Sequence, residues 1–282
     1  MNPWLGVRRG HLSDWTTQQW VRRTGRRVDL REEAWLDGPW APTTGIGERF
    51  FEDFAARHGL ELGRAAGLLP SFEALRSESF DPGAVDPRIA AFYERTSEYR
   101  LQLWSQWSPL HRPFGRMIDS IFARRLGQLR LPLAPLDTSR GVSSELLSLR
   151  GGDGPPATAW LRRRLPEGDV LFAGLYSAGR PRLAAGPCVK TVFPLPNGYA
   201  AVFLVPAARA DGSFELVSPP GEFGAPGFYF VVRDEAAAWS RTVAAMTEHI
   251  HVYIERGELH ADHALRLWGR GFLRLHYAMQ RG

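Results

Sequence analysis

Five of the eight histidines in this 282-residue chain lie in one short stretch: His249, His251, His260, His263 and His276. Because imidazole titrates near neutral pH, such side chains can move protons, hold metal ions or hydrogen-bond a ligand. Apolar residues recur at every second position around them, which is the period of a β-strand. The stretch therefore predicts strands that sort the histidines onto two faces.

The first two strands of this stretch can be aligned by keeping each face uniform, because a slip of one residue would mix the faces. A turn at Arg256-Gly257 pairs Ile254 with Leu259 and places His251 opposite Asp262. Directly opposed side chains lie about 5 Å apart at Cβ, so His251 and Asp262 are expected within hydrogen-bonding reach.

The third strand is expected to follow a three-residue loop, Gly269-Arg270-Gly271. That loop pairs Leu267 with Leu273 and His263 with Tyr277, and it puts His276 one residue diagonally from Asp262. His263 then falls on the apolar face, where a structural hydrogen bond to Tyr277 or to the backbone is expected.

The polar face is the candidate site. His251, Asp262 and His276 are the candidate catalytic residues, because a His–Asp pair can hold an imidazole for proton transfer. The candidate ligand-binding residues are Tyr253, His260, Arg274 and Trp268 nearby, with Tyr93 and Trp104 from the helical part. Three interpretations stay open: a solvated outer face, the lining of a ligand cavity, and a metal or acid–base site. No cofactor or metal ligand is predicted, and a metal site ranks lowest.

The elements that must position these residues are expected to be helices before about residue 140 and strands after it. Helices are expected at 13–24, 46–58, 86–107 and 113–126, the third starting at Asp86-Pro87 and the second ending at Gly59. Ten short β-segments follow between 143 and 279, with a hairpin at Asn197-Gly198, and the alanine-rich run at 234–247 favours a helix.

These elements predict an α+β protein with N-terminal helices packed on a large, strongly curved, mainly antiparallel sheet that ends in a three-stranded meander. Half-barrel, helix-grip and lipocalin-like folds have this form. We expect one domain over 1–282, with a Trp/Arg-rich arm at 1–45, a helical part at 46–135 and an antiparallel β part at 143–279.

Composition narrows the function classes. The single cysteine, Cys188, excludes an intrachain disulfide and fits a reducing, cytoplasmic location. No signal peptide and no apolar stretch of transmembrane length are recognised. Walker A, dinucleotide-binding, CxxC, HExxH and GxSxG motifs are absent from the sequence. Cys188 and Lys190, the only lysine, are expected to be structural.

The leading expectation is a protein that binds, and in one version chemically transforms, a hydrophobic or aromatic small molecule between the sheet and the helices. One alternative is a non-catalytic interaction protein whose Arg/Trp-rich arm binds an anionic partner; nucleic acid and a membrane surface both rank below a small molecule. Another is a metal-dependent enzyme using the His/Asp cluster. Whether the protein is an enzyme stays open, and the oligomeric state is not predicted.

Overall fold

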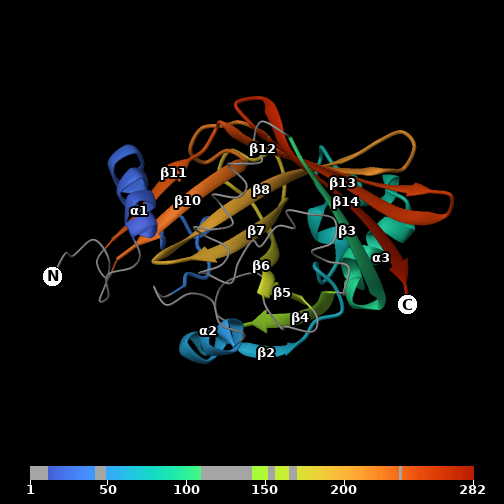
Figure 1. Cartoon of the computed structure of the whole chain (residues 1–282), viewed down its shortest axis with the longest axis horizontal. Helices are drawn as coiled ribbons and strands as arrows, with labels where there is room; N and C mark the ends of the chain where they lie inside the picture. Colours follow the sequence, from blue (N-terminus) through green and yellow to red (C-terminus); the bar gives the residue numbers. More distant parts are fainter. Residues whose placement is uncertain (1–11, 42–48, 109–141, 152–155, 165–169, 235–236) are drawn as a thin grey trace.

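The computed structural model describes residues 12–41, 49–108, 142–151, 156–164, 170–234 and 237–282 (Figure 1). Within them, fourteen strands form one antiparallel sheet that is not closed. Their bounds are β1 (Arg26–Val28), β2 (Glu61–Arg64), β3 (Tyr99–Trp107), β4 (Val142–Arg150), β5 (Ala157–Arg164), β6 (Val170–Gly179), β7 (Cys188–Leu195), β8 (Gly198–Ala208), β9 (Phe214–Ser218), β10 (Gly227–Arg233), β11 (Ala238–Thr242), β12 (Met246–Glu255), β13 (Glu258–Leu267) and β14 (Arg270–Arg281).

The sheet divides at β8, whose one edge pairs with two different strands. Its first half, from Gly198 to Phe203, pairs with β10, which continues to β11 and β1. Its second half, from Val205 to Ala208, pairs with β9, which continues through β12, β13 and β14 to β3. The other edge of β8 pairs with β7, followed by β6, β5, β4 and β2.

Three α-helices lie around this sheet: α1 (Leu12–Thr24), α2 (Phe50–His58) and α3 (Pro87–Glu94). Figure 1 shows α1 beside β10 and β11, α2 beside β2 and β4, and α3 at the far end near β3. The predicted start at Asp86-Pro87 and the predicted stop at Gly59 are confirmed: the Asp86 carboxylate accepts the N–H of Arg88, and Gly59 ends α2 at φ 62°. The described residues also form three short 3₁₀ helices: η2 (Phe72–Leu75), η3 (Pro82–Ala84) and η4 (Thr96–Glu98).

The prediction of one helix over 86–107 is wrong after Glu94. The Thr96 hydroxyl donates to the Phe92 carbonyl and accepts the N–H of Leu68, which closes the helix end. Residues from Tyr99 onwards pair along their whole length with β14. Tyr99, Leu101, Leu103 and Trp107 alternate with mainly polar residues, which is a strand period that the prediction of one long helix did not take into account. The predicted helix at 113–126 lies outside the described residues.

The preference for a helix at 234–247 is also wrong, because 238–242 form β11. This strand is hydrogen-bonded to β10 on one side and to β1 on the other, and Ala238 and Ser240 are buried. Two pairing partners outweigh the weak helical propensity of a short alanine run. The hairpin near Asn197 is confirmed: Leu195 pairs with Gly198, and Asn197 takes the left-handed conformation (φ 55°).

The β12–β13 register is confirmed, with Ile254 opposite Leu259 and His251 opposite Asp262. The predicted β13–β14 register is wrong by two residues, since Leu265 pairs with Leu273. The turn is the two-residue Trp268-Gly269, both with positive φ (50° and 73°), and a bulge follows Leu265. Because side chains alternate with period two, a shift of two residues keeps the side chains of β13 up to Leu265 and of β14 from Leu273 on their predicted faces. Beyond the bulge, Arg266 and Leu267 pair three residues from the predicted position.

The largest core cluster defines an inner face of the sheet. It joins Leu69, Phe72, Ile89 and Phe92 from residues 65–99 to inner-facing side chains of most strands. Strands far apart in the sheet contribute to it together, including β4, β5, β13 and β14, so the sheet bends around this core. We call the opposite side the outer face.

On the β8–β10 branch, the outer face is covered by the N-terminal arm. The Trp35 ring packs on Phe203 and Tyr229 with ring centroids 5.2 and 5.4 Å away. No helix in the described part of the chain is long and apolar enough to cross a membrane.

Candidate functional site

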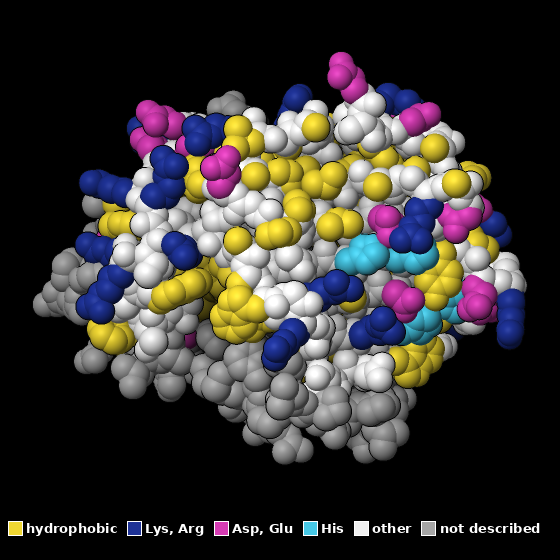
Figure 2. Space-filling view, turned by 90° about the horizontal axis from the view of Figure 1, so that it is seen from above, with side chains coloured by type: hydrophobic (Ala, Val, Ile, Leu, Met, Phe, Trp, Pro, Cys, Tyr) yellow, Lys and Arg dark blue, Asp and Glu magenta, His cyan; other side chains and the backbone are white. Residues whose placement is uncertain are grey.

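The predicted polar residues of β12, β13 and β14 share the outer face. Trp104, predicted on a helix, lies on β3 and joins this face opposite His276. Figure 2 shows the histidine side chains gathered at one place on the surface, with acidic and arginine side chains around them. We call this surface the histidine face; it consists of His249, His251, Tyr253, His260, Asp262, Arg274, His276 and Trp104.

His251 and Asp262 lie opposite each other across β12 and β13, as predicted, but each is hydrogen-bonded to a different residue. Nε2 of His251 lies 2.9 Å from Oγ of Ser213, and that hydroxyl donates to Asp211 at 2.7 Å. A serine whose proton points at a carboxylate is not set up for activation by the histidine. Burial and the nearby Arg209 charge lower the pKa of His251.

Two other histidines of this face, His276 and His249, have acidic partners. Nδ1 of His276 lies 2.9 Å from an Asp262 oxygen, because the true register places these residues directly opposite each other. Nε2 of His249 lies 2.6 Å from a Glu215 oxygen, which also accepts from Arg209 at 2.6 Å. Only Nδ1 of His260, among the ring nitrogens described on this face, is buried without a partner.

The rings of the histidine face form a row across three strands. Centroids are 5.0 Å apart for His251–Tyr253, 5.8 Å for Tyr253–His260 and 5.5 Å for His260–His276, each pair near-parallel. Trp104, with 43% of its surface exposed, ends the row 5.8 Å from His276. Rings that stack on one another present mainly their edges to solvent, so this row is a poor platform for stacking an aromatic ligand.

Two other predicted ligand-binding residues lie apart from this row. Trp268 occupies the β13–β14 turn and is 78% exposed. Tyr93 is buried on α3, where its ring contacts Phe72 and Phe214 in the core beneath the inner face. Arg274 is exposed on the histidine face opposite Ala264.

Sequence reasoning missed a second polar group, on the inner face. We call it the interior polar cluster; it consists of Arg162 on β5, Tyr176 on β6, Glu248 on β12, His263 on β13 and Tyr277 on β14. His263 was placed on this face correctly, but its partner is Glu248 (3.2 Å) and not Tyr277. The alternation of Thr158, Trp160 and Arg162 was the available signal, since it puts an arginine in line with a core tryptophan.

Arg162 is the most unusual member of the interior polar cluster. It is 7% exposed, and its Nε atom is buried without a hydrogen-bond partner. Burial lowers the pKa of its guanidinium, and Tyr277 and Tyr176 oppose this shift. Burial likewise raises the pKa of Tyr176 and of Tyr277. The adjacent Arg163 also has a buried Nε without a hydrogen-bond partner, but its Nη2 lies 3.3 Å from a Glu145 carboxylate oxygen.

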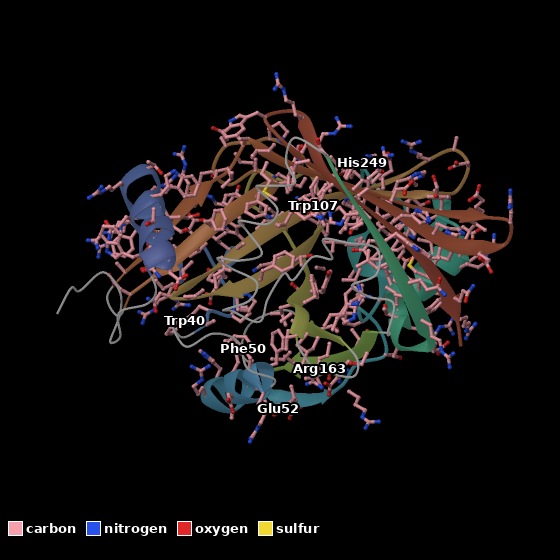
Figure 3. All side chains as sticks on the ribbon, viewed as in Figure 1. Trp40, Phe50, Glu52, Trp107, Arg163 and His249 are labelled. Atoms are coloured by element: carbon pink, nitrogen blue, oxygen red, sulfur yellow. The ribbon has the colours of Figure 1, made fainter. Side chains whose placement is uncertain are left out.

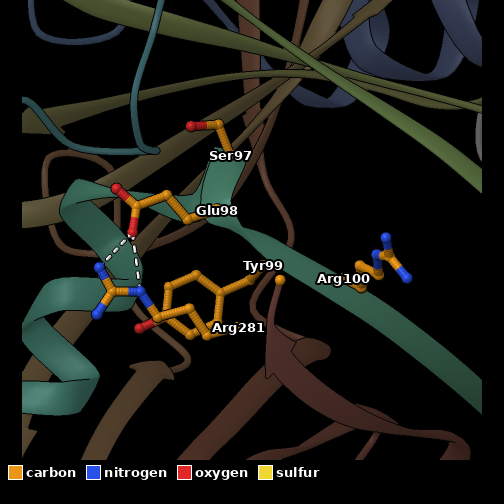
Figure 4. Close-up of a pocket in the computed structure, with 6 residues that line it drawn as sticks. Ser97, Glu98, Tyr99, Arg100 and Arg281 are labelled. Carbon is orange, nitrogen blue, oxygen red and sulfur yellow. Dashed lines mark hydrogen bonds and ion pairs between the residues drawn. The ribbon is translucent and has the colours of Figure 1, made fainter.

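The hollows found among the described residues lie away from both polar groups. One, of about 460 Å³, is lined by Ser97–Arg100, Arg281 and Gly282, and Figure 4 shows Arg281 paired with Glu98 across it. The second, of about 30 Å³, lies beside Cys188. No group of three or more His, Cys, Asp or Glu residues suited to a metal ion occurs within the described ranges.

Lys190 and Cys188 lie on the outer side of β7, under the N-terminal arm. The Lys190 ammonium donates to the carbonyls of Trp35 and Asp37, and burial lowers its pKa to about 8. These bonds attach the arm to the sheet, which supports the structural role expected for this lysine.

Comparisons with protein-family models, with curated proteins and with solved structures found no match to this chain. Function therefore has to be inferred from the geometry.

Proposed function

We propose that this protein binds a hydrophobic or aromatic small molecule inside a half-barrel formed by the curved sheet around residues 65–99. The observation that carries this proposal is the interior polar cluster, in which titratable side chains lie among aromatic rings on the inner face. A few convergent polar groups within an apolar lining are the usual composition of a small-molecule site.

The aromatic part of this lining comes from β5, β6 and β7. The Trp160 and Phe172 rings lie 5.6 Å apart, and Phe172 also contacts Phe193 at 5.5 Å. Tyr176, Phe172 and Tyr277 face the core yet keep part of their surface accessible. Such partly accessible rings supply an apolar surface on which a ligand could pack.

The inner face supports this proposal better than the histidine face. On the histidine face, His249, His251 and His276 each have a hydrogen-bond partner within the protein. A chemical step, if the ligand is transformed, would use Glu248 and His263, because this pair lies on the same face as the lining.

The arginine-rich arm gives less support to an anionic partner. The Arg22 guanidinium lies 4.4 Å from the Trp239 ring, and that of Arg26 lies 4.3 Å from Phe223. These two arginines of the arm therefore make cation–π contacts inside the protein, which leaves them less available to an anionic partner.

The neutral probe N-phenyl-1-naphthylamine, whose fluorescence rises in apolar surroundings, tests the proposal. We expect saturable binding, weakened about tenfold by Ala178→Leu, because the larger side chain fills space on the inner face. Ala264→Leu makes the same change on the histidine face and should leave the affinity unchanged. Absence of saturable binding to the wild-type protein, or a loss confined to Ala264→Leu, would contradict the proposal.

A further inference from the structure

The buried guanidinium of Arg162, whose Nε has no acceptor, has a specific consequence for the ligand. Ionised side chains are rarely buried without a counter-ion, because leaving water costs more than apolar surroundings return. Arg162 is more than nine-tenths buried, its Nε finds no acceptor, and no carboxylate of the described residues contributes to its electrostatics. Each such group in a native protein calls for an explanation, and an absent ligand is one.

The neighbours of Arg162 compensate its charge only in part. Its guanidinium lies 5.4 Å from the Trp160 ring, a cation–π contact. Tyr176 and Tyr277 lie near enough to influence it, but a phenol is neutral at physiological pH, and burial raises the pKa of both further. The Glu248 carboxylate is hydrogen-bonded to His263. Among the described residues, no carboxylate therefore lies close enough to Arg162 to contribute to its electrostatics.

We propose that the ligand is a carboxylic acid with an aromatic or aliphatic body, and that its carboxylate binds the guanidinium of Arg162. This inference rests on the proposed function. The planar guanidinium matches a carboxylate in shape and can donate two parallel hydrogen bonds to it. A single cation balances a monoanion, which favours a carboxylate over a phosphate dianion. The body of the ligand would lie against Trp160, Phe172 and Tyr176.

Two probes that differ only in the head group test this inference: 2-naphthoic acid and 2-naphthalenemethanol, titrated by calorimetry at pH 7. We expect the acid to bind wild-type protein at least about tenfold more tightly than the alcohol, as a charge-assisted pair adds to the common apolar contact. Arg162→Met should abolish this preference. Arg163→Met removes the neighbouring arginine, whose partner is Glu145, and should preserve it.

The outcomes separate the two proposals. Equal binding of acid and alcohol by the wild-type protein overturns the carboxylate inference and leaves the proposed function standing. Failure of both probes to bind counts against the proposed function itself. Retention of the preference by Arg162→Met also overturns the inference.

If Arg162→Met does not fold, a pH titration of the wild type decides. Binding of the acid should weaken as its carboxylate is protonated, while binding of the alcohol should not. Parallel weakening of both would contradict the inference.

Discussion

The histidine face and the interior polar cluster carry polar residues in different ways. On the histidine face, His249, His251 and His276 bond to Glu215, Ser213 and Asp262. Across the sheet interior, Arg162 is more deeply buried and has an Nε atom without an acceptor. The difference teaches that a dense group of polar side chains does not by itself mark a site. A buried charged group with unused hydrogen-bonding capacity, such as Arg162, is a stronger signal than the unpartnered Nδ1 of the partly exposed His260.

Figure 3 shows how far these groups are spread over the sheet. His249 lies on β12 at the upper side of the view, and Arg163, next in the chain to Arg162, lies beside β4 at the lower side. The interior polar cluster contains residues of both β5 and β12, and these strands come together only because the sheet bends.

The largest expected effect comes from breaking the packing beneath the inner face. Phe214 is fully buried against the rings of Phe72, Phe80 and Tyr93. Phe214→Ala should lower the free energy of unfolding by about 3–5 kcal/mol, because it leaves a cavity. Trp104→Ala, on the half-exposed end of the histidine face, should cost about 1 kcal/mol or less. Urea denaturation measures both, and equal losses would contradict the assignment of the core to the inner face.

Replacing Arg162 should change the free energy of unfolding in the opposite direction. Without ligand, Arg162→Met should raise the free energy of unfolding by about 1–4 kcal/mol, since an apolar side chain of similar length removes the cost of a buried charge. Thermal unfolding of ligand-free protein measures this. A marked loss of stability would show that Arg162 serves the fold and not a ligand.

Lys190 provides the matched case of a buried cation with partners. Lys190→Met leaves the carbonyls of Trp35 and Asp37 without their donor. We therefore expect a loss of about 1–3 kcal/mol. Unfolding of this variant beside Arg162→Met separates the two kinds of buried cation, and a gain in stability for both would remove the contrast between them.

The smallest effect is expected from His251. Because its pKa is lowered in the folded state, the folded protein binds fewer protons than the unfolded chain just below about pH 6.5. Stability should therefore fall on acidification through this range. His251→Gln should reduce the loss between pH 7.5 and 5 by less than about 1 kcal/mol, because solvent screens this half-exposed side chain. A larger loss in the variant would reverse the assigned direction.

The sequence predicted the sheet face that a side chain occupies better than it predicted the hydrogen-bond partner of that side chain. The face of each side chain in 248–279 follows from alternation, which survived a register error of two residues at Trp268-Gly269. Hydrogen-bond partners such as Ser213 for His251 depend on β9, which no local pattern places beside β12. Arg162 was missed because its burial arises from strands distant in sequence. The strand at 99–107 was missed because its pairing with β14 spans most of the chain.

The central claim, that the ligand site is on the inner face, is tested most directly by a crystal structure of the protein with 2-naphthoic acid. We predict the carboxylate at about 3 Å from the Arg162 guanidinium, with the rings against Trp160 and Phe172. The same molecule bound beside His276 and Asp262, with Arg162 still without a partner, would contradict the claim.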